Sequence, residues 1–170
     1  MFKSKAKQPR PKPIIEGQES VWSYPRPPAV EQTSKLIQVF FADTLIAETR
    51  SAWRVLETSH PPVYYLPRHD LNMTYLHPIN AASGCEWKGS AQYFDLRVGE
   101  QHSPQAVWTY PQPTDHFNLI KNHFAFYAQR VDRCFIDGEL VQPQPGSFYG
   151  GWITQEIVGP FKGSPGSFGW

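Results

Sequence analysis

Short runs in which apolar and polar residues alternate recur along the chain, and this two-residue period is typical of β-strands with one buried face. Gly, Pro, Asn and Asp separate many of the runs, as expected for short strands joined by turns. The runs lie at residues 37–41, 45–47, 52–56, 63–66, 90–98 and 106–110. The pattern predicts a mainly β protein, either a small tent-like domain or a sandwich of antiparallel sheets.

Two turn signals predict hairpins. Residues 42–44 separate the first two runs and should let them pair as neighbours. Asp137-Gly138 lies between the apolar stretches 133–136 and 139–141, and an Asp-Gly pair readily adopts the tight turn of a hairpin. We therefore expect an antiparallel pair around each turn.

One stretch has the period of a helix. Apolar residues between 115 and 128 follow a three-to-four spacing, and Thr114 or Asp115 can cap its start, so the sequence predicts one α-helix there. The spaced residues are Phe117, Ile120, Phe124 and Tyr127. Residues 67–84 show no clear period and are expected to form a mixed loop.

Composition divides the chain into three parts. Residues 1–20 are basic and Pro-rich and predict a flexible leader. Residues 21–142 predict a single β-rich domain, because the 6 Trp, 8 Tyr and 11 Phe of the chain favour a folded core despite 17 Pro and 12 Gly. Residues 143–170 combine Gly, Pro and aromatic residues, and we expect this extension to pack on the domain.

A repeated seven-residue motif suggests an internal duplication. Residues 21–27 read Val-Trp-Ser-Tyr-Pro-Arg-Pro, and residues 107–113 read Val-Trp-Thr-Tyr-Pro-Gln-Pro. If the two copies share an origin, they should form equivalent strands.

The charge balance argues against nucleic acid as a partner. The net charge is +1, whereas duplex binding needs a clustered positive field. One basic cluster occurs, in the leader, and it is either a solvated segment or a tether to RNA or a membrane surface. It consists of Lys3, Lys5, Lys7, Arg10 and Lys12.

Hydropathy and cysteine content indicate a cytoplasmic protein without a membrane span. No apolar run approaches the roughly 18 residues that cross a bilayer, and the start of the chain lacks the apolar stretch of a signal peptide. Cys85 and Cys134 are the only cysteines. They leave a single disulfide open but do not resemble a secreted disulfide framework.

Several motifs occur in order and resemble a bacterial family known as domain of unknown function 427, which also carries a nucleotidyltransferase-like label. They are Tyr-Leu-Pro-Arg-His-Asp at 65–70, Cys-Glu-Trp-Lys-Gly-Ser-Ala-Gln-Tyr at 85–93, Ala-Val-Trp-Thr-Tyr-Pro-Gln-Pro at 106–113 and Phe-Ala-Phe-Tyr at 124–127. The resemblance covers residues 38–137 and implies a compact, mainly β domain with one helix, similar to β-tent folds. It implies no settled activity, and the segments outside it look like those of an elaborated member.

Two departures from the family pattern and its label matter. The family usually has Pro directly after the cysteine, where this chain has Glu86, and the change should alter the turn and its charge. Nucleotidyltransferase chemistry needs a Gly-Ser turn followed by closely spaced aspartates that hold magnesium. Gly84-Cys85 precedes no such pair, Asp95 stands alone, and no Gly-rich phosphate loop is present. We therefore reject the label as a mechanism.

Cys85 is the candidate catalytic nucleophile. Lys88 lies three residues further on and would stabilise its thiolate, and His60, His69 or His77 would act as the base. Against this, the adjacent glutamate would raise the pKa of the thiol, and no histidine lies at a diagnostic spacing. A buried structural cysteine is the alternative.

The turn Trp87-Lys88-Gly89 suggests a ligand site. Gly89 permits a positive φ, so the turn can direct the Lys88 ammonium into an aromatic cavity that suits a planar or anionic molecule. The expected walls are Trp87, Tyr93, Trp108 and Tyr110. In the alternative interpretation, the rings form ordinary core and Lys88 is solvated.

Arg68 is a candidate ligand contact at the mouth of the same cavity, Asp70 is a candidate catalytic carboxylate there, and Asp132 could line it too. Surface ion pairing is the alternative for all three. The sequence has no Cys-x-x-Cys, His-x-x-x-His or His-Glu-x-x-His motif, so we predict no metal and no cofactor.

Three functional hypotheses follow. The first is a small-molecule-binding module in which Lys88 and Arg68 contact a ligand between aromatic walls. The second is a low-turnover enzyme that uses Cys85 or a carboxylate such as Asp70. The third is a protein-interaction scaffold that acts through the Pro-rich leader.

Overall fold

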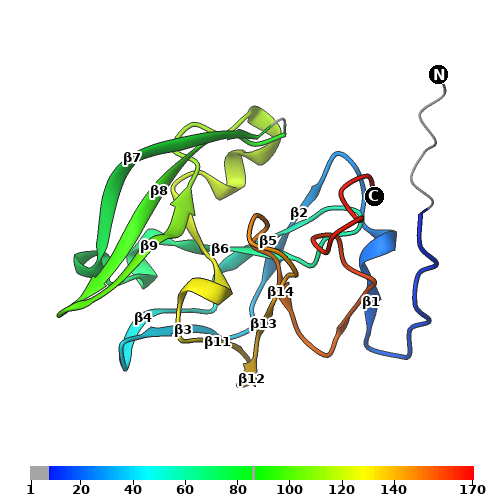
Figure 1. Cartoon of the computed structure of the whole chain (residues 1–170), viewed down its shortest axis with the longest axis horizontal. Coiled ribbons are helices and arrows are strands. Elements are labelled where there is room, and N and C mark those ends of the chain that lie inside the picture. The colour runs from blue at the N-terminus through cyan, green and yellow to red at the C-terminus, as the bar shows by residue number, and fades with distance from the viewer. Residues whose placement is uncertain (1–7, 86) are drawn as a thin grey trace.

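A seven-stranded antiparallel sheet forms the centre of the protein (Figure 1). The computed structural model describes residues 8–85 and 87–170. Across the sheet the strands follow the order β2-β5-β6-β10-β9-β8-β7. In that order they are Ala29–Thr33, Ala52–Leu56, Val63–Pro67, His123–Phe126, Gln101–Thr109, Gly89–Val98 and Leu76–Cys85. The mainly β class predicted from the alternation is confirmed.

A four-stranded antiparallel sheet covers one face of the large sheet. Its strands, in spatial order, are β12 Glu139–Leu140, β11 Arg133–Ile136, β3 Ile37–Phe41 and β4 Thr44–Thr49. Ala42 and Asp43 both have positive φ, as do Asp137 and Gly138. This is the backbone of the tight mirror-image turns that match the twist of paired strands. Both predicted hairpins are confirmed.

The large sheet is buried on both faces. Along β6, Tyr64 and Leu66 join the core shared with the four-stranded sheet, whereas Tyr65 belongs to an aromatic cluster on the opposite face. The central strand β10 shows the result most clearly, because Phe124, Ala125 and Phe126 are all at most 2% exposed. Side chains that alternate along a strand therefore all find apolar surroundings here.

The two ends of the described chain lie side by side beyond β5 (Figure 1). Strand β1 Glu19–Ser20 pairs in parallel with β15 Ile157–Val158, and the Lys12 amide donates to the Gly159 carbonyl at 3.0 Å. Strand β13 Gln142–Pro143 pairs with β14 Trp152–Ile153. The leader residues Lys3, Lys5 and Lys7 lie outside the described residues.

The predicted α-helix at 115–128 is wrong in type. The chain forms a short 3-10 helix, η4 Asp115–Ile120, and then strand β10. The helical run ends at Ile120, because Lys121 leaves the helical conformation, and Asn122 follows with φ 54. The three-to-four spacing arose by coincidence, since Phe117 and Ile120 pack in the aromatic cluster while Phe124 packs on the opposite face of the sheet.

All helical elements among the described residues are short 3-10 turns, and η4 is the longest at 6 residues. The others are η1 Val21–Ser23, η2 Arg68–Asp70, η3 Met73–Tyr75 and η5 Ala128–Arg130. None of them is long and apolar enough to cross a membrane.

Two further expectations are wrong. Half of the predicted loop 67–84 belongs to the edge strand β7, which is largely exposed and therefore lacks the apolar alternation that marks the other strands. The two copies of the repeated motif, residues 21–27 and 107–113, are not equivalent strands. Val21–Ser23 forms the 3-10 helix η1, whereas the second copy continues strand β9.

Gly163→Ala should destabilise the fold by about 3 kcal/mol, because it combines backbone strain with overpacking. Gly163 has φ 133, and an added Cβ would lie 1.9 Å from the Pro145 carbonyl oxygen. Gly84→Ala is the matched control, since nothing lies within 4 Å of its added Cβ. Urea unfolding measures the free energy of unfolding of both variants. Equal values would contradict the close contact between Gly163 and Pro145.

Candidate functional site

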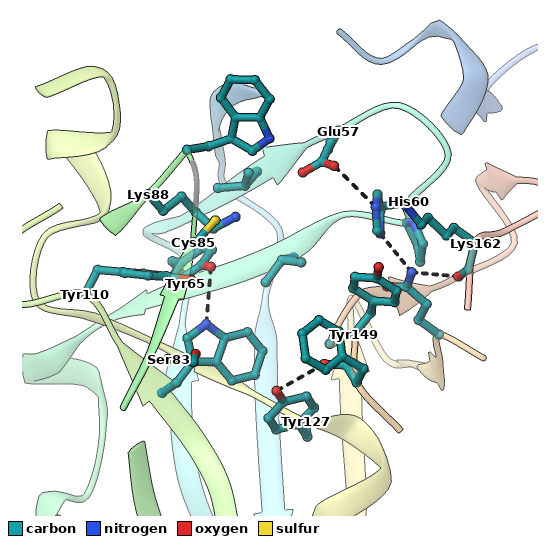
Figure 2. Close-up of a pocket in the computed structure, with 18 of the residues that line it drawn as sticks. Glu57, His60, Tyr65, Ser83, Cys85, Lys88, Tyr110, Tyr127, Tyr149 and Lys162 are labelled. Atoms are coloured by element: carbon teal, nitrogen blue, oxygen red, sulfur yellow. Dashed lines mark hydrogen bonds and ion pairs between the residues drawn. The ribbon is translucent and has the colours of Figure 1, made fainter. Parts of the chain in front are cut away.

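A cavity of about 460 Å³ opens on the face of the large sheet that carries the aromatic cluster. Cavities of this size hold small organic molecules. Eight aromatic residues line the cavity: Tyr65, Trp87, Tyr93, Trp108, Tyr110, Tyr127, Phe148 and Tyr149. Among the described residues, the charged side chains that line it are Glu57, Lys88 and Lys162, and His60 lies beside Glu57 (Figure 2).

Two different parts of the chain enclose this cavity. Strands β6, β8 and β9 supply Tyr65, Tyr93 and Trp108 as its floor. The segment after β13 supplies the facing wall through residues 144–150 and Lys162. This wall approaches the floor closely, because a Cβ added to Gly150 would lie 2.3 Å from the Trp108 ring. No larger residue fits there without displacing the wall.

The turn between β7 and β8 holds Lys88. Gly89 has φ 100, a conformation that favours glycine, and an added Cβ would lie 3.2 Å from the Gln112 carbonyl oxygen. Thr114 fixes the turn through two hydrogen bonds: its amide donates to the Lys88 carbonyl at 3.2 Å, and its hydroxyl donates to the Trp87 carbonyl at 2.5 Å. The turn is thus tied to the chain that precedes η4.

The Lys88 ammonium lies against aromatic faces. Its Nζ is 5.9 Å from the ring centroids of both Tyr110 and Phe117, within the range of cation–π attraction. The Cys85 thiol and the Tyr65 hydroxyl lie close to it in Figure 2. Lys88 and Tyr110 both line the cavity, and a ligand contact by Lys88 stays a prediction.

Phenol hydroxyls supply hydrogen-bond donors at the end of the cavity where Lys88 lies. The Trp108 Nε1–H donates to the Tyr65 hydroxyl at 3.3 Å, which orients that oxygen. Burial raises the pKa of Tyr65 and of Tyr110, so both phenols keep their proton at neutral pH. Lower in the cavity, the hydroxyls of Ser83 and Tyr93 lie 2.6 Å apart.

His60 occupies a fixed position on the other side of the cavity. The Gly151 amide donates to Gln144 Oε1 at 3.0 Å, which orients the Gln144 amide group. Gln144 Nε2 then donates to His60 Nδ1 at 3.0 Å and to the Lys162 carbonyl at 2.8 Å. The proton of neutral His60 is therefore on Nε2, which faces Glu57 Oε2 at 3.3 Å. Both ring nitrogens are engaged.

Glu57 stays ionised in this position. Burial disfavours its carboxylate, but the hydrogen bond from His60 and the charges of Lys88 and Arg26 lower its pKa below the usual 4.5. For Lys162, burial and the charge of Arg26 lower the pKa of the ammonium, and Glu57 opposes that shift. Glu57 thus lies within electrostatic reach of both lysines that line the cavity.

Six of the eight residues predicted for the site line this cavity, and two do not. The six are Cys85, Trp87, Lys88, Tyr93, Trp108 and Tyr110. The predicted contact Arg68 instead lies 6.0 Å from the Phe124 ring centroid. Asp70 accepts a hydrogen bond from the Thr49 hydroxyl at 2.6 Å, on the side of β4. Geometry therefore separates these two from the Lys88 turn.

Cys85 lies in the cavity as a free, half-buried thiol. Glu86, whose charge is expected from the sequence to raise the pKa of this thiol, lies outside the described residues. His60 is the candidate base that shares the cavity, but Gln144 already occupies its Nδ1 lone pair. Within the described ranges, no group of three or more Asp, Glu, His and Cys side chains could hold a metal ion.

Sequence reasoning missed the wall beyond residue 143. Gln144, Tyr149 and Lys162 lie far along the chain from the Lys88 turn, and no spacing rule relates them to it. The adjacent Gly150-Gly151 pair was the one usable signal, because glycines among aromatic residues often mark a close approach of backbone to rings.

Residues 29–137 match a protein family described as a domain of unknown function (DUF427), with the label NTP_transf_9. The match covers more than half of the sequence. The chain belongs to the DUF427 family. A search of curated proteins finds no match. The DUF427 region contains the floor of the cavity and the Lys88 turn, and it ends before the wall at 144–162.

Iodoacetamide should alkylate Cys85 and spare Cys134 in the folded protein. Cys134 is 2% exposed, and its burial raises the pKa of the thiol, so it offers little thiolate to the reagent. Peptide mass spectrometry after labelling at neutral pH distinguishes the two sites. Cys85→Ser should take up label only after unfolding in urea, and rapid native labelling of Cys134 would contradict the packing.

Glu57→Gln should lower the free energy of unfolding at pH 7 and change its dependence on pH. Because the pKa of Glu57 is lower in the folded state, its carboxylate stabilises the fold above about pH 4.5, and this contribution is lost as pH falls through the folded-state pKa. The wild-type and variant stabilities should therefore converge in acid. Glu100→Gln, on the exposed turn after β8, controls for the lost charge. A difference independent of pH would contradict the prediction.

Proposed function

We propose that the protein binds a small planar anion in the aromatic cavity, with Lys88 as its cationic contact. One observation carries this proposal: the Lys88 ammonium lies at 5.9 Å from two ring centroids in a cavity of about 460 Å³. Flat rings on several sides offer stacking surface to a planar molecule, and an ammonium among apolar walls attracts an anion more strongly than one in water.

Charge balance supports an anionic ligand. Lys88, Lys162 and the carboxylate Glu57 are the charged side chains among the described lining residues, so that part of the lining carries a net positive charge. Arg26 adds a further cation beside Glu57, with Nε 3.7 Å from Oε2. An anion would therefore enter a favourable potential.

The enzyme hypothesis receives less support from this geometry. A Cys-His pair needs a histidine with a free lone pair directed toward the thiol. His60 accepts from Gln144 through Nδ1 and faces Glu57 through Nε2, so it is arranged as a structural link. The second predicted catalytic residue, Asp70, does not line the cavity.

Lys88→Met should weaken binding of aromatic carboxylates about 10- to 100-fold, the cost of one charge-assisted contact in a partly buried site. Benzoate and 2-naphthoate, each compared with its neutral amide, are suitable probes for isothermal titration calorimetry. Lys121→Met removes an exposed lysine that does not line the cavity and should bind like the wild type. If the carboxylates bind no better than the amides, the proposal is wrong.

A further inference from the structure

We infer that the ligand carries an anionic oxygen at the Lys88 end of the cavity and a neutral O–H or N–H donor at the Glu57 end. This inference rests on the proposed function and names its ligand class, a hydroxyaryl or aminoaryl carboxylate. It comes from the different chemistry of the two ends. In Figure 2, Lys88 and Tyr110 lie on one side of the cavity, and His60 and Lys162 lie on the other, with Glu57 between and above them.

The Lys88 end offers donors. The Lys88 ammonium can only donate, and the phenols of Tyr65 and Tyr110 keep their protons because burial raises their pKa values. These groups are near neighbours: the charge of Lys88 and the hydroxyl of Tyr65 both influence Tyr110. Several donors that converge on one region hold a carboxylate well, since its two oxygens together accept up to four hydrogen bonds.

The Glu57 end offers an acceptor. Glu57 is the one carboxylate among the described residues that line the cavity. Its contacts with His60 and Arg26, at 3.3 and 3.7 Å, both use Oε2, which leaves Oε1 for a ligand. Because this carboxylate is ionised, it can only accept, and a ligand group that faces it must donate.

Nearby cations select a neutral donor over an ammonium. Arg26 and Lys88 already favour the charged form of Glu57, and Lys162 lies within its electrostatic reach. A further positive charge would be repelled by these groups, whereas a phenol or an aryl amine adds a hydrogen bond without a charge. A ligand with one negative charge also matches the excess of one cation over carboxylate in the lining.

Lys88 and Glu57 line the same cavity of about 460 Å³, so one rigid aromatic molecule can reach both. The charge of Lys88 also contributes to the lowered pKa of Glu57. Aromatic residues such as Trp87 and Trp108 line the same cavity and suit a flat ring system. A ring that carries its carboxylate and its donor on opposite edges would contact both ends at once.

The test compares donors with isosteric non-donors on the intact chain. Isothermal titration calorimetry with 4-hydroxybenzoate against 4-fluorobenzoate, and with 6-hydroxy-2-naphthoate against 6-fluoro-2-naphthoate, covers two ring lengths. In at least one pair the hydroxyl compound should bind about tenfold more tightly to the wild type, as expected for one hydrogen bond to a carboxylate. Glu57→Gln should reduce that preference to about twofold, whereas Glu100→Gln should retain it.

Lys88→Met separates this inference from the proposed function. It should weaken both members of a pair and leave their ratio unchanged, because the carboxylate contact is common to them. If the fluoro compounds bind the wild type as tightly as the hydroxyl compounds at both ring lengths, the inference is wrong while anion binding stands. If no carboxylate binds, the proposed function fails as well. An unchanged preference in Glu57→Gln would show that Glu57 serves only to anchor His60 and Arg26.

Discussion

Burial of the large sheet on both faces is the constraint from which the rest of the structure follows. Strand β10 places Phe124 and Phe126 on one face and Ala125 on the other, so neither face can be left to water. The four-stranded sheet covers the first face with regular structure. The second face is covered by irregular segments, the turn η4 and the chain beyond residue 143, and such a cover leaves the space that becomes the cavity.

The contacts that hold this cover in place also orient the polar groups of the cavity. Trp152 packs against Tyr64 and donates from Nε1 to the Phe126 carbonyl at 2.9 Å, which fixes the segment to the central strands. Gln144 joins His60, Gly151 and the Lys162 carbonyl through one amide group. Fold stability and the preorganisation of the Glu57 end therefore depend on the same few hydrogen bonds.

Local patterns predicted the mainly β class and both hairpins, because alternation and turn chemistry act over a few neighbouring residues. The α-helix failed because Phe117 and Phe124 serve opposite faces of a sheet that the sequence does not display. Arg68 and Asp70 were expected at the mouth of the same cavity, yet neither of them lines it. Glu57 and Lys162 became neighbours through tertiary packing alone, which no short-range pattern encodes.

The family match ends at residue 137, while Gln144, Tyr149 and Lys162 come from beyond it. All seven strands of the large sheet and the Lys88 turn lie within the family match, so residues outside it supply one wall of a cavity whose floor the family domain provides. If the cavity binds a ligand as proposed, exposed positions in the segment 144–150 could change the ligand contacts without altering a strand of that sheet.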